Sequence, residues 1–187
     1  NLVVNKEERV PDIAGFGTPP LHKDGVLLLQ AQEYHSSYWG HLGLLFLDDH
    51  YLTPGFVGYQ QSAMTSVYPT NGAIADLTHA QHGLVGYAHP FDTPPETDAV
   101  LTNALPADVA LGKADYYEAV GFDDHLVTNE VWYKLLNCGF RLPAGAGTDA
   151  MTNYASLRGP VGMNRVFLDT GGANTPRQLV SATSIAL

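Results

Sequence analysis

The chain has 187 residues, of which 45% are hydrophobic, and this size and composition suit one domain with a hydrophobic core. Its net charge of -10 argues against a nucleic-acid surface or an anionic-membrane anchor, because both need basic patches. No apolar run approaches the roughly 20 residues that span a bilayer. The single Cys138 excludes an intrachain disulfide and a cysteine-rich zinc knuckle, and we expect this thiol to be packed in a helix.

Strand-like and helix-like segments alternate along most of the chain. Strands are expected over residues 25–33, 41–47, 84–88, 115–122 and 140–147, and helices over 71–83, 105–113 and 128–139. Gly83 is placed to end the first helix, while Thr128 and Gly139 are placed to cap and end the third. Alternation with short loops predicts parallel strands with right-handed crossovers, in an α/β barrel or a layered sheet.

Both ends of the chain suggest part of a longer protein. The opening "NLVVNKEERV" is typical of a strand that runs into a charged loop, and "TPRQLVSATSIAL" resembles an uncompleted helix capped by Thr175. We therefore expect residues 1–187 to form a single domain that lacks its first strand or strands and its C-terminal end. The sequence leaves the cellular compartment and the oligomeric state open.

Metal-ligating side chains follow several of the expected strands. Because chemistry in α/β folds collects at the carboxyl ends of parallel strands, we expect these groups to meet at one edge. The candidates are Glu33, His41 (which opens the returning strand), His89, Asp123 or His125, and Asp149. The histidine of "LVGYAHPF" is thus interpreted as a ligand rather than as a packed core residue.

Other histidines and acids are expected to lie away from this edge. Residues 48–50 ("DDH") follow the strand that starts at His41, so they should form a solvated turn at the opposite edge. His79 and His82 lie three residues apart on a helix, which favours a surface or packing role.

Glutamate, histidine and aspartate without cysteine form a ligand set that suits a divalent metal: Zn, Mn or Fe(II). A cation held in this way activates water, and hydrolysis of a small-molecule substrate is the natural outcome.

The aromatic loop "EYHSSYWGH" separates two of the proposed ligands, and its Tyr38 and Trp39 either wall a substrate pocket or pack as a loop core. Arg158 is a candidate contact for a substrate anion or a structural guanidinium, and His35 is a candidate proton shuttle or support for Glu33.

Four motifs, "QEYHSSYWGHLGLL", "GYAHPF", "YYEAVGF" and "PAGAGTDA", resemble in order the later motifs of the PHP (polymerase and histidinol phosphatase) superfamily. The most similar branch is that of the CehA/McbA-like metallohydrolases, which includes carbaryl hydrolases, and the resemblance covers about residues 21–169. It implies a distorted (β/α)7 barrel with mostly parallel strands and up to three metals. It also implies that Glu33 bridges metals and that His41, His89 and Asp149 are ligands.

Departures from the family pattern change the expected number of metals. The opening His-x-His motif is absent, no Asp-His pair stands at the expected place near the start, and Met151 stands where the closing Asp-x-His motif has histidine. Because a thioether is a poor ligand for a hard cation, we expect at most one or two metals, with Glu33, His41 and His89 as the core of one site.

The leading hypothesis is a PHP-type metal-dependent hydrolase that acts on a phosphoester, or on an amide, carbamate or other ester. His35 or His125 would manage protons. The alternative is a degenerate, non-catalytic PHP-fold module for ligand binding or assembly, which the missing ligands and Met151 favour.

Overall fold

The computed structural model describes residues 21–24, 26–28, 31–48, 52, 63, 65–91, 103–122, 124–150, 158–172 and 178. The expected strand at residues 1–10, the expected helix after Thr175, and Asp123 and Met151 all lie outside these residues. In chain order the elements are β1 (Leu21–Lys23), β2 (Val26–Leu28), β3 (Ala31–Tyr34), β4 (Leu42–Leu45), α1 (Asn71–Ala80), β5 (Leu84–Tyr87), α2 (Leu105–Ala110), β6 (Tyr116–Val120), α3 (His125–Asn137) and β7 (Ala144–Ala146).

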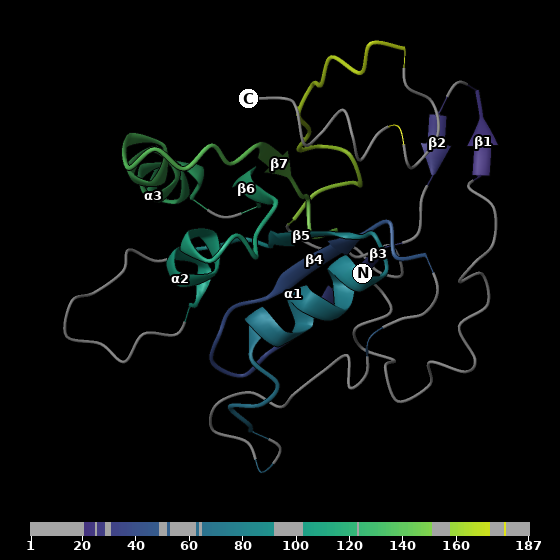
Figure 1. Ribbon diagram of the computed structural model, residues 1–187. Coiled ribbons are helices and arrows are strands. Elements are labelled where there is room, and N and C mark those ends of the chain that lie inside the picture. The colour runs from purple at the N-terminus through teal and green to yellow at the C-terminus, as the bar shows by residue number, and fades with distance from the viewer. Residues whose placement is uncertain are drawn as a thin grey trace.

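Five of the strands form one open, mixed sheet in the order β3-β4-β5-β6-β7 (Figure 1). The strand β4 is antiparallel to both β3 and β5, while β5, β6 and β7 are parallel. The α/β class is confirmed, but the expectation of mostly parallel strands is wrong, because β3 and β4 form an antiparallel hairpin. The segment expected as one strand over 25–33 is divided, since β2 pairs with β1 in a separate two-stranded sheet.

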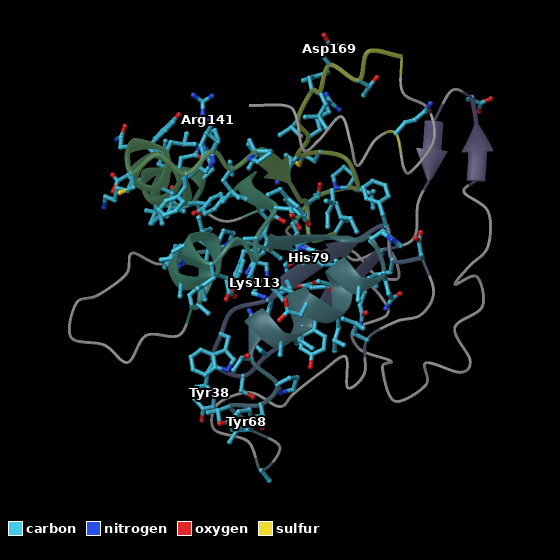
Figure 2. The ribbon with its side chains drawn as sticks, viewed as in Figure 1. Tyr38, Tyr68, His79, Lys113, Arg141 and Asp169 are labelled. Carbon is cyan, nitrogen blue, oxygen red and sulfur yellow. The ribbon has the colours of Figure 1, made fainter. Side chains whose placement is uncertain are left out.

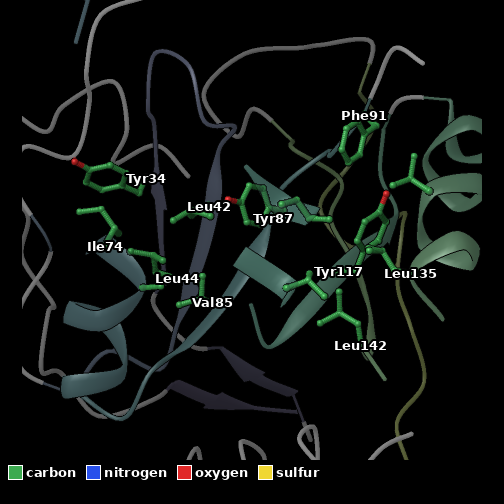
Figure 3. Close-up of a cluster of buried hydrophobic side chains, with 14 of the residues drawn as sticks. Tyr34, Leu42, Leu44, Ile74, Val85, Tyr87, Phe91, Tyr117, Leu135 and Leu142 are labelled. Carbon is green, nitrogen blue, oxygen red and sulfur yellow. The ribbon is translucent and has the colours of Figure 1, made fainter. Parts of the chain in front are cut away.

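All three helices contribute to a core on one face of the five-stranded sheet (Figure 3). Tyr34, Leu42, Tyr87 and Tyr117 are partners in register across four neighbouring strands, and all four side chains are fully buried. The helices cover this row with Ile74 and Ala75 from α1, Leu105 and Val109 from α2, and Val131 and Leu135 from α3. Burial of this many large side chains is the main stabilising term of the fold.

The opposite face of the sheet carries several glycine residues. Gly43, Gly86 and Gly145 lie on three strands, and a Cβ at any of them would overlap the side chain of Tyr116. The Tyr116 hydroxyl donates to the Gly43 carbonyl at 3.0 Å, so this side chain lies across the neighbouring strands. Because side chains alternate along a strand, Glu33 and Glu118 project on this same face, away from the helices.

The helix ends differ from the prediction in detail. In α1 the left-handed position belongs to His82, with φ of 59°, while Gly83 is needed for space beside Thr78 and the Leu45 carbonyl. The helix α3 begins earlier than expected because Asp124 caps it by accepting from the Leu126 N–H at 3.0 Å. Thr128 therefore lies inside the helix.

The end of α3 contains one confirmed prediction and one wrong one. Gly139 adopts φ of 90° immediately after the helix, as its placement predicted. Cys138, expected to be packed, is exposed at the C-cap.

In the part of the chain that the structure describes, the helices are too short or too polar to cross a bilayer.

Candidate metal centre

The direction of the strands brings Glu33, His41 and His89 to one edge of the sheet. Because β4 is antiparallel to both of its neighbours, the ends of β3 and β5 lie beside the start of β4. Glu33 is near the end of β3, His41 precedes β4, and His89 follows β5. The Ala88 N–H donates to the His41 carbonyl at 3.0 Å, which extends the pairing of β4 and β5 up to the site.

Three donor atoms converge there. Glu33 Oε1 lies 3.4 Å from His41 Nδ1 and 3.4 Å from His89 Nε2, and the two ring nitrogens lie 3.2 Å apart. The side chains are 10%, 23% and 18% exposed, respectively, so the donors are shielded but reachable. Among the described residues, these three are the group whose donor atoms could share a metal ion.

The triangle of donors has the size that a divalent cation requires. A cation about 2.1 Å from each donor sets donor–donor distances of about 3.0 Å in octahedral and about 3.4 Å in tetrahedral coordination. The observed edges of 3.2–3.4 Å fall within this range. Three protein donors also leave coordination positions for water or substrate, as catalytic sites do. The residues therefore fit a divalent metal ion that keeps open coordination positions.

The ionisation of the three groups is strongly coupled. Burial alone would raise the pKa of Glu33, but hydrogen bonds from His35, His41 and His89 outweigh it and hold this pKa well below its ordinary value. Burial lowers the pKa of His41, which keeps its ring neutral. Burial also opposes a charge on His89, but the hydrogen bond to Glu33 and nearby carboxylates raise the pKa of His89 to about 9. His89 thus holds a proton where a cation would bind.

His35 supports the group from one side. Its Nε2 lies 3.3 Å from Glu33 Oε1, and its ring stacks on that of His41 with centroids 3.8 Å apart and planes 10° from parallel. The structure therefore places His35 beside the ligands, as the sequence analysis expected. Its contacts are those of a residue that orients Glu33 and His41.

A cavity of about 170 Å³ opens next to these donors. It lies on the glycine-rich face of the sheet, with Glu33 and His89 on its wall. The other lining residues are Ala31, Gln32, Gly43, Leu45, Ala88, Glu118 and Asp149. A small ligand in this cavity would contact two of the proposed metal ligands, Glu33 and His89. It would also contact the carboxyl groups of Glu118 and Asp149.

Glu118 is the pocket residue that the sequence analysis missed. It is 9% exposed, and one carboxyl oxygen accepts from the His89 N–H at 3.3 Å. Burial raises the pKa of Glu118 to about 7, and the charges of Glu33 and Asp149 act in the same direction. The available signal was an acidic residue inside the apolar strand "YYEAV", since such a residue must be buried or face a site.

Asp149 lines the pocket but stands apart from the three-donor group. Its Oδ2 forms an ion pair of 2.5 Å with Arg158 Nη1, which also donates to the Asp149 carbonyl at 3.3 Å. Backbone φ at both His89 and Asp149 is positive (32° and 49°), a conformation that is costly for these residues and clusters at functional sites.

The remaining candidates lie elsewhere. His125 is exposed at the first residue of α3 and does not line the described pocket. The Tyr38 hydroxyl accepts from Thr65 at 3.1 Å, and Trp39 Nε1 donates to the Val67 carbonyl at 2.9 Å. Figure 2 shows Tyr38 close to Tyr68, in the same loop cluster. These contacts join Tyr38 and Trp39 to residues 65–67, and neither side chain lines the described pocket.

The loop that carries His35 and His41 is held by buried polar groups. Asn71 Nδ2 donates to the carbonyls of Trp39 and Gly40 at 2.9 and 3.0 Å, and to the Tyr87 hydroxyl at 3.1 Å. That hydroxyl donates in turn to Asp108 Oδ2 at 2.5 Å. These contacts join the loop to α1, β5 and α2, which fixes the position of His41.

The opposite edge of the sheet has its own histidine contacts. His79 Nε2 lies 2.8 Å from Asp115 Oδ2, and His82 Nδ1 lies 3.1 Å from Asp48 Oδ2. Asp48 follows β4, and His82 and Asp115 precede β5 and β6, so these pairs lie at the far edge as expected.

Comparisons of the chain with family models, with curated proteins and with solved structures found no match.

Proposed function

We propose that the chain is part of a PHP-type metal-dependent hydrolase whose distorted (β/α)7 barrel includes the sheet described above. The observation that supports this most is the convergence of Glu33, His41 and His89 beside a cavity of about 170 Å³. The motif resemblance supports hydrolysis but leaves the bond type as a phosphoester, or an amide, carbamate or other ester.

Each group near the cavity has a role in this proposal. Glu33, His41 and His89 would hold Zn, Mn or Fe(II), and His35 would keep Glu33 and His41 in orientation. When bound, a divalent cation lowers the pKa of a water and polarises a phosphoryl or acyl oxygen. Glu118 faces the same cavity, and with a pKa of about 7 it can accept or donate a proton near neutral pH. Glu118 replaces His125 as the proposed proton carrier.

The test uses the full-length protein with 4-nitrophenyl phosphate, bis(4-nitrophenyl) phosphate, 4-nitrophenyl acetate and an aryl carbamate as probes. We expect turnover of one class that a chelator abolishes and Mn²⁺ or Zn²⁺ restores. His89→Ala should abolish it, and His79→Ala, at the opposite edge, should not. A protein that binds metal but cleaves no probe would favour the non-catalytic module, and turnover that is indifferent to chelation would contradict the proposal.

A further inference from the structure

The ion pair of Arg158 and Asp149 borders the candidate metal centre. Asp149 shares the pocket wall with Glu33, His89 and Glu118, and its charge reaches both His89 and Glu118. Its carboxylate nevertheless stands outside the group of donors that could share one ion. What this carboxylate contacts instead is a guanidinium.

Arg158 is fixed in this position by contacts of three kinds. Its Nη1 lies 2.5 Å from Asp149 Oδ2 and 3.3 Å from the Asp149 carbonyl. Its Cζ lies 4.4 Å from the centre of the Phe122 ring, and the edge of that ring meets His89 with centroids 5.6 Å apart. Guanidinium groups remain charged in proteins and combine well with a carboxylate and an aromatic face. A permanent positive charge therefore lies against Asp149 of the pocket wall.

The charges of the described pocket balance with one divalent ion. Glu33, Glu118 and Asp149 are its three carboxyl groups, and Arg158 is the guanidinium paired with Asp149. When all three acids are ionised, they and Arg158 sum to two negative charges, which one divalent cation neutralises. A second divalent cation at Asp149 would displace Arg158 from its ion pair or lie against it in a shielded site, where like charges repel strongly.

We propose that Arg158 takes the place of a second cation, so that this chain binds one divalent ion, at Glu33, His41 and His89. Arg158 would then be neither a free anion contact nor a distant structural residue. It would neutralise Asp149 and set the number of ions in the pocket. This inference rests on the proposed metal centre.

The experiment is a metal count. The chain is dialysed to equilibrium against Mn²⁺ and, separately, Zn²⁺, and bound metal is measured by elemental analysis. We expect one ion per chain in the natural protein, in Arg158→Lys, which keeps the charge, and in Arg165→Met. Arg165 is a matched control because it lies in the same segment but is exposed and donates to the Gly162 carbonyl. Arg158→Met should bind a second ion, and adding Asp149→Asn should return the count to one.

The outcomes separate the two proposals. Absence of bound metal from the natural protein would overturn the metal centre itself. Two ions in the natural protein, or one ion in a folded Arg158→Met variant, would overturn only the role of Arg158. If Arg158→Met does not fold, the Asp149→Asn variant tests the role of Arg158 on its own. In that variant no carboxylate neutralises the guanidinium, and its charge should weaken binding of the single ion about tenfold. Unchanged affinity would contradict the inference.

Discussion

Nδ1 of His41 and Nε2 of His89 lie 3.2 Å apart, although 48 residues separate the two histidines in the chain. Both nitrogens also lie 3.4 Å from the same oxygen of Glu33. This contact follows from the order β3-β4-β5, which places a strand start between two strand ends. The arrangement is compact enough for one cation, and the predictions below test its consequences.

Removal of one proposed ligand should weaken metal binding far more than removal of a histidine at the other edge. We expect His41→Ala to reduce affinity for Zn²⁺ more than about 100-fold, beyond the loss seen for residues that only support ligands. The matched control is His79→Ala, because His79 pairs with Asp115 away from the site. Isothermal titration calorimetry measures both, and equal affinities in the two variants would exclude His41 as a ligand.

Metal binding should become tighter as pH rises. The pKa of His89 is raised to about 9, so this ring carries a proton at neutral pH that a cation must displace. The neutral ring of His41 adds no such competition, because its pKa is lowered. We expect affinity to increase by up to about tenfold per pH unit near pH 8, with one proton released per ion, because Glu118, with its pKa of about 7, is already largely ionised there. Calorimetry in buffers of different ionisation enthalpy measures this proton, and affinity independent of pH would refute the assignment.

Glu118→Gln should stabilise the metal-free protein at high pH. Because the folded-state pKa of about 7 exceeds the ordinary value of 4.5, the folded protein binds the proton more tightly than the unfolded chain does. The contribution of Glu118 to stability therefore falls as pH rises from about 4.5 to 7 and stays low above that. Urea denaturation at pH 5 and pH 8 should show a relative gain of about 1–3 kcal/mol for the variant at pH 8.

Glu130 provides the comparison for this measurement. It lies exposed on α3, so Glu130→Gln should change the free energy of unfolding by similar small amounts at both pH values. A Glu118→Gln variant that behaves in the same way would show that the Glu118 carboxyl is not held in an unfavourable environment.

Asn71→Ala should destabilise the fold and loosen the loop that carries His41. The substitution removes the Asn71 amide donor from the carbonyls of Trp39 and Gly40, which keep the Ala104 N–H and the Ser36 hydroxyl, respectively. A hydrogen bond contributes about 0.5–1.5 kcal/mol net, and we expect a total loss of about 1–3 kcal/mol in chemical denaturation. Asn137→Ala, at the exposed end of α3, is the control. Equal stability of the two variants would contradict a structural role for Asn71.

Much of the fold was accessible from local patterns. The types of the described elements from α1 to β7 were correct because hydrophobic periodicity and Gly139 mark them. The cap of α3 was misplaced because Asp124 and Thr128 are both good capping residues, and only packing puts Thr128 inside, where it donates to the Pro90 carbonyl. The mixed sheet was missed because alternation of helix and strand reports parallel pairing only for β5 to β7.

The sequence predicted the site residues whose place follows from their position next to a strand end. Glu33, His41 and His89 lie next to strand ends, so the rule for carboxyl ends brings them together without knowledge of side-chain contacts. The same rule misplaced His125, because the start of α3 carries it to the surface. It also gave no information on Glu118, which lies inside β6, or on the ion pair that holds Asp149.

The most direct test of the metal centre is a crystal structure of the chain grown with Mn²⁺ or Zn²⁺, with anomalous diffraction recorded at the metal edge. A single strong peak is expected about 2.0–2.3 Å from Glu33 Oε1, His41 Nδ1 and His89 Nε2. A metal peak away from these three atoms, or no peak in a protein saturated with either ion, would contradict the assignment.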